Sequence, residues 1–173
     1  YYNDVQQRSF DASVLASIPL VEGMGPDGAT HAVVLSETCF YPEGGGQEGD
    51  HGSLTTDGTS RQVLDTQKEG NLILHLCDGP LEIGDLVRGT IDWRRRKQLM
   101  DHHTAVHIVG GAARRILGPH IYQAGANKSI EIARLDITHY RRLGRDDLDA
   151  IETLANEVLG QVSRTEKTIL PRH

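Results

Sequence analysis

The sequence of 173 residues lacks any long apolar run. A stretch such as Val33–Leu35 is far shorter than the ~20 residues that a membrane-spanning helix needs. The first residues, Tyr1–Asp4, carry neither a basic region nor an apolar segment, so they do not indicate a signal peptide. They also lack an initiator Met, which indicates a piece of a longer chain. We therefore expect a cytoplasmic protein with no membrane partner.

Cysteine is also scarce, since the chain contains only Cys39 and Cys77. Two cysteines cannot form a disulfide framework, and we expect two buried thiols in a reducing compartment. Hydrophobic residues make up 38% and charged residues 24%, so a core is feasible and wholesale disorder is excluded. The length allows one domain or two small ones, at about 150 residues per domain.

The net charge of −6 hides an uneven distribution. Between Trp93 and Arg145 the chain has eleven basic and three acidic residues, although the protein as a whole is acidic. Such a basic segment is typical of a site for a polyanion. The alternative is that these arginines only solvate helix faces.

The first ninety residues read as short strands separated by turns rich in Gly, Asp and Pro. This pattern predicts a small barrel or a strongly twisted sheet. The expected strands are Asp11–Ile18, Thr30–Ser36, Arg61–Thr66, Leu72–Cys77 and Leu86–Asp92.

The pattern changes to helical spacing after Asp92. We expect a helix over Arg94–Leu117, ended by Gly118 and Pro119, because glycine accepts the left-handed cap and proline cannot continue the helix. A strand over Ile130–Thr138 with a bulge near Arg134 should follow, and then a helix over Arg145–Val162. The expected subdomains are a β-rich part, 1–92, and an α/β part, 93–173.

A pair of histidines on the first helix forms a candidate metal site. His103 and His107 are four residues apart, so both imidazoles leave the same helix face, a spacing that suits one metal ion. His102 points about 100° away and cannot join them. Gly110 and Gly111 follow on that face, at a cost of about 1 kcal/mol each relative to Ala. The alternative is two packed or surface histidines.

Three consecutive glycines, Gly44, Gly45 and Gly46, precede Gln47. Glycine loses the most chain entropy on folding, so such a run favours a backbone that faces a ligand or is closely approached. It is not a phosphate-binding P-loop, because the Gly-Lys-Ser/Thr ending is absent. The alternative is a flexible surface turn.

Gln123 is a further candidate, because an amide among small residues can hold a substrate carbonyl or hydroxyl. An ordinary loop amide is the alternative. Thr104 and Asp136 are weaker candidates, which could equally be a helix-surface hydroxyl and a strand-end carboxylate.

Four segments of the sequence follow one another in a characteristic order and spacing: Pro42–Gly52, Met100–His107, Gln123–Ala126 and Arg134–Tyr140. Together they resemble the editing region of alanyl-tRNA synthetases. The superfamily also includes freestanding editing proteins and the related domain of threonyl-tRNA synthetases. Glu43 favours a piece of an archaeal-type synthetase over a freestanding editing protein.

The resemblance implies an α+β fold, with a glycine-rich β-barrel-like N-terminal subdomain followed by an α/β zinc-type editing subdomain. It implies hydrolysis of Ser- or Gly-tRNA(Ala), within a ligase that also binds ATP. His103 and His107 would be Zn²⁺ ligands. Gln123 would contact the amino acid or terminal ribose, and Gln123 and Thr104 would be the catalytic residues. The segment Gly44–Gln47 would form the pocket wall. Arg94, Arg95 and Arg96 would face the acceptor end of tRNA(Ala).

The sequence departs from the family at one point. The family completes its zinc site with a Cys-x3-His motif after the second helix, and this sequence has none. We therefore expect an editing region that lacks its C-terminal part, binds zinc poorly and has an opening lined by Gly110, Gly111 and Gln123. A freestanding editing protein, a non-catalytic tRNA-binding module and an unrelated metal-dependent hydrolase are the alternatives.

Overall fold

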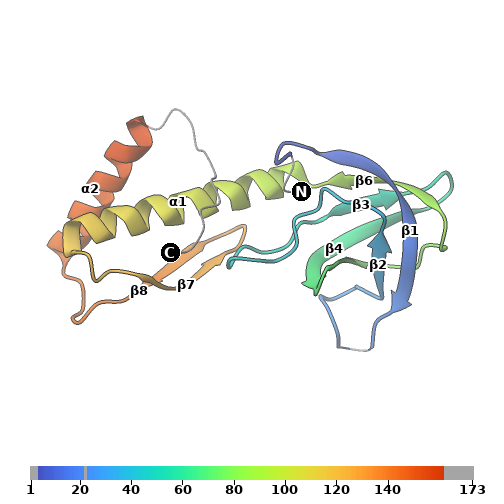
Figure 1. The fold of residues 1–173 in the computed structure, drawn as a ribbon, viewed down its shortest axis with the longest axis horizontal. Helices are drawn as coiled ribbons and strands as arrows, with labels where there is room; N and C mark the ends of the chain where they lie inside the picture. Colours follow the sequence, from blue (N-terminus) through green and yellow to red (C-terminus); the bar gives the residue numbers. More distant parts are fainter. Residues whose placement is uncertain (1–3, 22, 162–173) are drawn as a thin grey trace. The chain divides into compact units, whose positions relative to one another are not determined.

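The computed structural model describes residues 4–21 and 23–161 (Figure 1). The strands in this part of the chain are β1 (Ser9–Pro19), β2 (His31–Leu35), β3 (Gly52–Thr55), β4 (Ser60–Glu69), β5 (Leu72–Cys77), β6 (Leu86–Ile91), β7 (Gln123–Lys128) and β8 (Ala133–Ile137). The helices are α1 (Trp93–Leu117) and α2 (Arg145–Gln161).

Strands β1 to β6 close into an antiparallel barrel in the order β1-β2-β5-β4-β3-β6. The register shifts between Val14 and Ala16 in β1 and between Val63 and Asp65 in β4. Bulges of this kind bend a strand and increase its twist, which helps a small sheet to close. The barrel predicted for the N-terminal part is confirmed.

The five predicted strands are present as β1, β2, β4, β5 and β6. The sequence analysis missed β3, because its four residues, Gly52–Thr55, include only one large apolar side chain. Backbone pairing to both β4 and β6 makes this segment a strand. A short run that gains its stability from two neighbours leaves little periodic signal in the sequence.

The barrel core is aliphatic, with two phenylalanines at its centre. The Phe10 ring lies where a Cβ on Gly89 would be, so the glycine makes room for the ring. Phe40 meets Phe10 edge to face, with 6.0 Å between ring centroids. Cys39 and Cys77 are buried and free, as predicted, and burial raises the pKa of the Cys77 thiol to about 12.

His75 is a polar residue inside this core and has no exposed surface. Its Nδ1 donates to the Val33 carbonyl at 3.0 Å, and its Nε2 lies 2.9 Å from the Thr38 hydroxyl. The ring also packs edge to face on Phe40. Both ring nitrogens therefore have partners in the neutral state, and burial lowers the pKa of His75 to about 4.

Helix α1 begins and ends at residues that the sequence indicates. The Asp92 carboxylate accepts from the Arg95 backbone N–H at 3.0 Å, which caps the first turn. Gly118 adopts a φ of 118° and its N–H bonds to the Arg114 carbonyl at 3.1 Å. The predicted stop at Gly118 is confirmed.

The strand expected over 130–138 is present as β8, Ala133–Ile137, but residues 130–132 do not belong to it. The chain forms a hairpin, β7 paired with β8, and residues 129–132 are its turn. The Ser129 N–H donates to the Ile132 carbonyl at 3.0 Å, and the Ser129 hydroxyl accepts from the Ile132 N–H at 3.1 Å. A serine side chain that bonds to nearby backbone favours a turn over continued strand. The segment from Gln123, expected to be a loop, is the first strand.

Helix α2 starts at Arg145 as predicted, preceded by Gly144. The Asp147 carboxylate accepts from the Gly144 N–H at 2.9 Å. It also accepts from Arg141, which lowers the pKa of Asp147 to about 2. A carboxylate in the first turn also favours the helix dipole. The helix contributes Ile151 and Ala155 to a second, smaller core.

The described residues divide into two compact units. Unit 1 comprises the described part of Tyr1–His103 together with Asn127–Ala133, and unit 2 comprises Thr104–Ala126 with the described part of Arg134–His173. This division differs from the expected segments 1–92 and 93–173. The reason is that the first residues of α1 and the turn of the hairpin bond to loops of the barrel, as described below.

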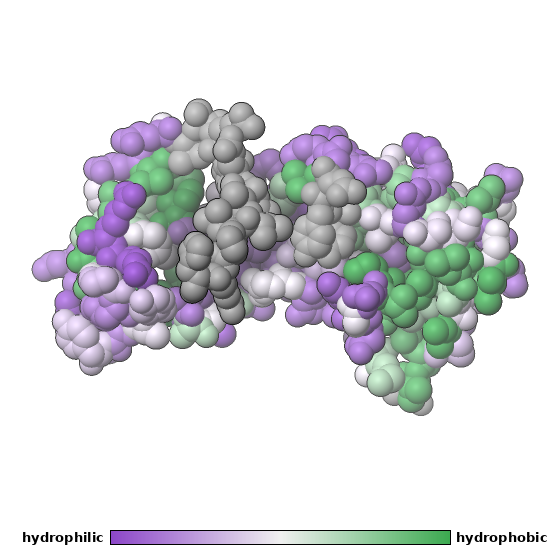
Figure 2. Space-filling model, in the orientation of Figure 1, coloured by the Kyte–Doolittle hydropathy of each residue, from purple (hydrophilic) through white to green (hydrophobic). Residues whose placement is uncertain are grey.

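No helix among residues 4–21 and 23–161 is long and apolar enough to cross a membrane. The outer surface of the barrel nevertheless carries exposed apolar side chains. Figure 2 shows hydrophobic residues gathered over the barrel strands. Those with more than half of their surface exposed on and beside β1 and β6 are Leu15, Ile18, Val21, Met24, Ile83 and Leu86.

His75 should make the stability of the chain depend on pH. Its folded pKa of about 4 lies below the ordinary value of 6.5, so between these pH values the unfolded chain binds more protons than the folded chain. The free energy of unfolding should therefore fall as the pH is lowered from 6.5 to 4, by up to about 3 kcal/mol. Urea titrations of the chain and of His75→Gln across this range measure the effect. The variant should be less stable at pH 8 and should show a flatter pH dependence; an unchanged slope would contradict the prediction.

Candidate functional site

The three glycines form a tight turn in unit 1. Gly44 and Gln47 exchange two backbone hydrogen bonds, each of 3.0 Å, so Gly45 and Gly46 are its two central residues. Their φ angles are 60° and 75°. Positive φ at both central positions is typical of a type I′ turn and requires glycine or a short polar residue. The turn is thus ordered, and the alternative of a flexible turn is wrong.

Lys128, at the end of β7, forms hydrogen bonds to this turn through both its backbone and its side chain. Its N–H donates to the Gly46 carbonyl at 2.6 Å and its carbonyl accepts from the Glu48 N–H at 3.1 Å. Its Nζ donates to the Gly45 carbonyl at 2.5 Å. The residue is only 1% exposed, and burial lowers the pKa of Lys128. The sequence analysis did not identify it, since a single lysine before a turn resembles a surface residue.

His103 in α1 lies against the same turn. Its Nδ1 is 2.9 Å from the Oε1 of Gln47, whose side chain is buried. A Cβ added to Gly45 would lie 3.5 Å from the Cε1 of His103, so the ring rests close to the backbone of the turn. Gln47 therefore contacts an imidazole within unit 1, whereas the sequence analysis assigned it to substrate.

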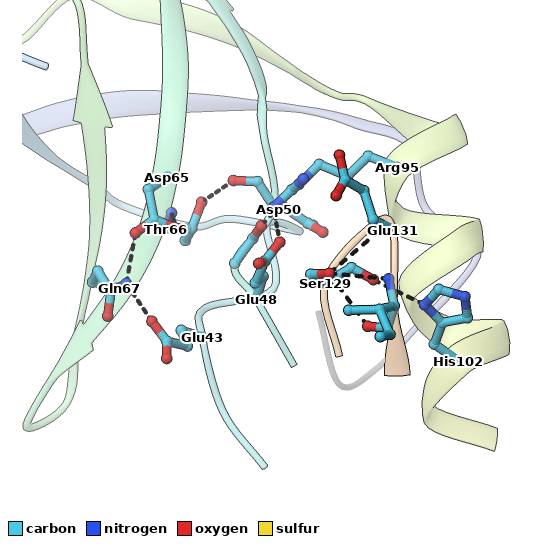
Figure 3. Close-up of polar contacts among 12 residues, drawn as sticks. Glu43, Glu48, Asp50, Asp65, Thr66, Gln67, Arg95, His102, Ser129 and Glu131 are labelled. Carbon is cyan, nitrogen blue, oxygen red and sulfur yellow. Dashed lines mark hydrogen bonds and ion pairs between the residues drawn. The ribbon is translucent and has the colours of Figure 1, made fainter. Parts of the chain in front are cut away.

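The neighbouring His102 is fixed separately. Its Nδ1 donates to the Ser129 carbonyl at 2.8 Å (Figure 3). Its Nε2 lies 2.8 Å from the Nε2 of Gln98. A carbonyl can only accept, so Nδ1 carries the hydrogen and Nε2 accepts from the Gln98 amide. His102 thus has a structural role, in agreement with its exclusion from the metal pair.

Two of the three arginines at the start of α1 are buried in unit 1. The guanidinium of Arg96 bonds to both carboxylate oxygens of Asp50 and donates to the Cys39 carbonyl at 2.7 Å. Asp50 also accepts from the Tyr41 N–H at 2.8 Å. Arg96 is 2% and Asp50 is 1% exposed, so this pair is shielded from solvent.

Arg95 is also engaged within the unit, where it donates to the Glu48 carboxylate at 2.7 Å (Figure 3). A second bond of 3.3 Å joins its Nε to the Gly49 carbonyl. Arg95 and Arg96 are therefore engaged by carboxylates, of which that of Asp50 is buried and that of Glu48 is partly exposed. The assignment of the three arginines to tRNA stays a prediction. Arg94 alone of the three is exposed.

Unit 2 contains a cavity of about 240 Å³. Its wall includes the two glycines in the middle of α1, with the imidazole of His107 before them and Gln123 on β7. The remaining lining residues are Val106, Arg114, Ile121, Tyr122, Leu135 and Ile137. An added Cβ on Gly111 would meet no atom within 4 Å, so this glycine leaves open space. The sequence analysis expected an opening beside these glycines, and the cavity is there.

The weaker candidates do not line this cavity. Thr104 lies in α1 at the start of unit 2 and is absent from the wall. Asp136 pairs with Arg134 at 3.1 Å, and its neighbours on β8, Leu135 and Ile137, line the wall in its place. Successive strand residues point to opposite faces, so Asp136 points away from the cavity.

The donor set is too small for a metal ion. Among residues 4–21 and 23–161, no group of three or more His, Cys, Asp or Glu side chains could hold one. His103 and His107 share α1 at the predicted spacing, but structural zinc takes four ligands and catalytic zinc usually takes three from protein. The described residues therefore do not fit a complete zinc site. His173 lies outside them.

Comparison with known proteins identifies the class. A profile of the class II tRNA synthetases (A) matches residues 2–95, which include the whole barrel, and the chain belongs to this family. Alanine--tRNA ligase of Natronomonas pharaonis is 46% identical over 160 residues, which cover 92% of this chain. The alanine--tRNA ligase of Pyrococcus furiosus is 44% identical over 174 residues, covering 99%, and that of Metallosphaera sedula is 42% identical over 176 residues, covering 96%. The matches cover only 17% to 18% of the length of these relatives.

The Arg96–Asp50 pair should dominate the stability of unit 1. Asp50→Asn leaves a buried guanidinium without a counter-charge, which should lower the free energy of unfolding by about 3–5 kcal/mol. Asp101→Asn is a matched control, because the Lys97–Asp101 pair on α1 is more than half exposed and such pairs contribute less than about 1 kcal/mol. Urea denaturation measures both changes, and similar losses would contradict the prediction.

Proposed function

We propose that this chain is the editing region of an alanine--tRNA ligase and that it hydrolyses the aminoacyl ester of Ser- or Gly-tRNA(Ala). The observation that carries the proposal is the cavity of unit 2, which joins His107 and Gln123 in a chain 46% identical to such a ligase. A non-catalytic tRNA-binding module is the second candidate, and the experiment below separates the two.

The size and lining of the cavity suit a small aminoacyl group. Its volume of about 240 Å³ is below the roughly 300–1,000 Å³ of pockets that enclose drug-sized ligands. Leu135 and Ile137 supply apolar wall, and Gln123 supplies an amide that can donate to an ester carbonyl and accept from a hydroxyl or amine. Gly110 and Gly111 let the ligand approach the helix backbone.

The need for such a site follows from the chemistry of alanine selection. A pocket shaped for a methyl side chain cannot exclude glycine by size, and discriminates only weakly against serine, which adds a hydroxyl. A second site that accepts these errors and hydrolyses them raises the accuracy beyond what binding alone supplies.

An exposed arginine in the cavity wall supports a substrate in which the aminoacyl group is attached to the 3′ end of a tRNA. Arg114 lines the wall, donates to the Ile121 carbonyl at 3.0 Å and lies 4.7 Å from the centroid of the Tyr122 ring. Its guanidinium can meet a phosphate. In unit 1, Arg94 is exposed on the first turn of α1 and is a separate candidate contact for tRNA.

The proposal includes candidate zinc ligands but no catalytic step that depends on zinc. His103 and His107 are two candidate ligands, and the described residues supply no third. A Zn²⁺ ion, when bound, would supply a Lewis acid or orient the substrate. We therefore assign no step to it and base the function on the cavity.

The first test uses the full-length ligase that carries this segment, with Gln123→Ala. Losing an amide that bonds to the reacting group should slow deacylation of Ser-tRNA(Ala) by about tenfold or more, since about 1.4 kcal/mol is a factor of ten. Charging with alanine and affinity for tRNA should not change, because phosphate contacts set affinity. Deacylation rates, aminoacylation rates and filter binding measure the three quantities. If all three fall together, or none does, Gln123 is not part of an editing site.

A pair of glycine variants serves as a matched control for the cavity. Gly111→Ala and Gly160→Ala both replace a helical glycine that has open space beside it. Each should stabilise its helix by up to about 1 kcal/mol. Only Gly111→Ala places a methyl group in the cavity, so it alone should slow deacylation. Equal deacylation rates in the two variants would favour the tRNA-binding module.

Metal retention tests the zinc part. Two imidazoles form a weak site, so the purified chain, loaded with zinc and dialysed, should retain much less than one zinc per chain. Elemental analysis measures the ratio, with His107→Ala as the control that removes one imidazole. One tightly retained zinc per chain would show that further ligands complete the site.

A further inference from the structure

The buried side chain of Gln47, which is only 3% exposed, forms a hydrogen bond with the imidazole of His103. Its Oε1 lies 2.9 Å from His103 Nδ1. An amide oxygen can only accept a hydrogen bond, so this contact requires hydrogen on Nδ1. In the neutral ring the lone pair is then on Nε2. The contact therefore selects one of the two tautomers of His103.

The backbone of Gln47 is held on both sides. Within the turn it exchanges two hydrogen bonds with Gly44. Beyond the turn it forms a parallel bridge with Lys128, whose backbone bonds to Gly46 and Glu48. A side chain with a fixed backbone and almost no exposed surface has few alternative rotamers. Gln47 is thus preorganised to orient the ring.

Lys128 supplies the remaining constraint. Placing an ammonium group where the residue is 1% exposed costs free energy, and its bond to the Gly45 carbonyl offsets part of this cost. The bond holds Gly45, the first central glycine of the turn, on which an added Cβ would lie 3.5 Å from the Cε1 of His103. Turn, lysine and glutamine therefore all act on the same ring.

We propose that Gln47 is a positioning residue that fixes His103 as the Nδ1–H tautomer, and that the glycine turn and Lys128 hold Gln47 for this purpose. The glycine-rich segment then acts on His103 rather than directly on substrate. The consequence for deacylation rests on the proposed function, in which His103 is a candidate metal ligand and Nε2 is the nitrogen that keeps a lone pair. The tautomer itself is independent of any activity.

The test is the long-range ¹H–¹⁵N correlation spectrum of the ¹⁵N-labelled chain, at a pH about two units above the ordinary imidazole pKa of ~6.5. It distinguishes protonated from unprotonated ring nitrogens. His103 should be the Nδ1–H tautomer in the parent chain. In Gln47→Met, which is similar in size and removes the acceptor, His103 should shift towards Nε2–H. Gln47→Glu, which keeps an acceptor oxygen, should restore Nδ1–H.

The neighbouring His102 is the internal control, because the Ser129 carbonyl fixes its tautomer by a separate contact. It should remain Nδ1–H in every variant, which also shows that the helix is folded. An Nε2–H signal for His103 in the parent chain would overturn the proposal, as would an unchanged signal in Gln47→Met.

The activity assay then separates this inference from the proposed function. In the full-length ligase, Gln47→Met should slow deacylation of Ser-tRNA(Ala) by about tenfold or more, Gln47→Glu should recover part of the loss, and alanine charging should not change. A tautomer change with unchanged deacylation would overturn the catalytic role of His103 alone. Absence of deacylation in the parent ligase would overturn the proposed function and leave the tautomer assignment intact.

Discussion

A guanidinium and a carboxylate with almost no access to solvent join the start of α1 to the loop that leads out of the glycine turn. Arg96 bonds to both oxygens of Asp50 and to the Cys39 carbonyl, and Asp50 also accepts from the backbone of Tyr41. Removing two charges from water is unfavourable unless geometry and additional hydrogen bonds compensate. Here two backbone groups, the Cys39 carbonyl and the Tyr41 N–H, complete the arrangement, so the pair fixes the start of α1 against this loop.

The Arg96–Asp50 pair also affects the position of His103, because it fixes both the helix that carries His103 and the loop that follows Gln47. The residue lies two helical turns after Arg96, and its partner Gln47 lies three residues before Asp50. The buried pair therefore sets where the helix and the turn meet, and the bond between Gln47 and His103 uses that alignment. Shifts of about 1 Å in such supporting groups are enough to disturb a site that depends on orientation.

The sequence predicted the barrel and both helices, because short β-branched runs and helical stripes are local patterns. Of the hairpin, only the strand β8 was expected, since the turn forms through Ser129 hydrogen bonds that apolar alternation does not report. The opening beside Gly110 and Gly111 was expected from the missing zinc ligands, and a cavity lies there. The roles of Arg95, Arg96 and Lys128 could not be predicted, because partners distant in the sequence decide whether a charge is buried.

The turn at Gly45 and Gly46 also limits which sequences can arise by drift. Both residues have positive φ, where nearly every side chain with a Cβ is strained. Single-nucleotide changes of a glycine codon give Ala, Val, Ser, Cys, Arg, Trp, Asp or Glu, and of these Asp is the residue that tolerates the left-handed region. At position 45 an aspartate would place a carboxylate beside the His103 ring. The one single-base substitution that the backbone tolerates would thus add a negative charge beside the imidazole. The other substitutions would strain the turn, so both charge and backbone conformation restrict this position.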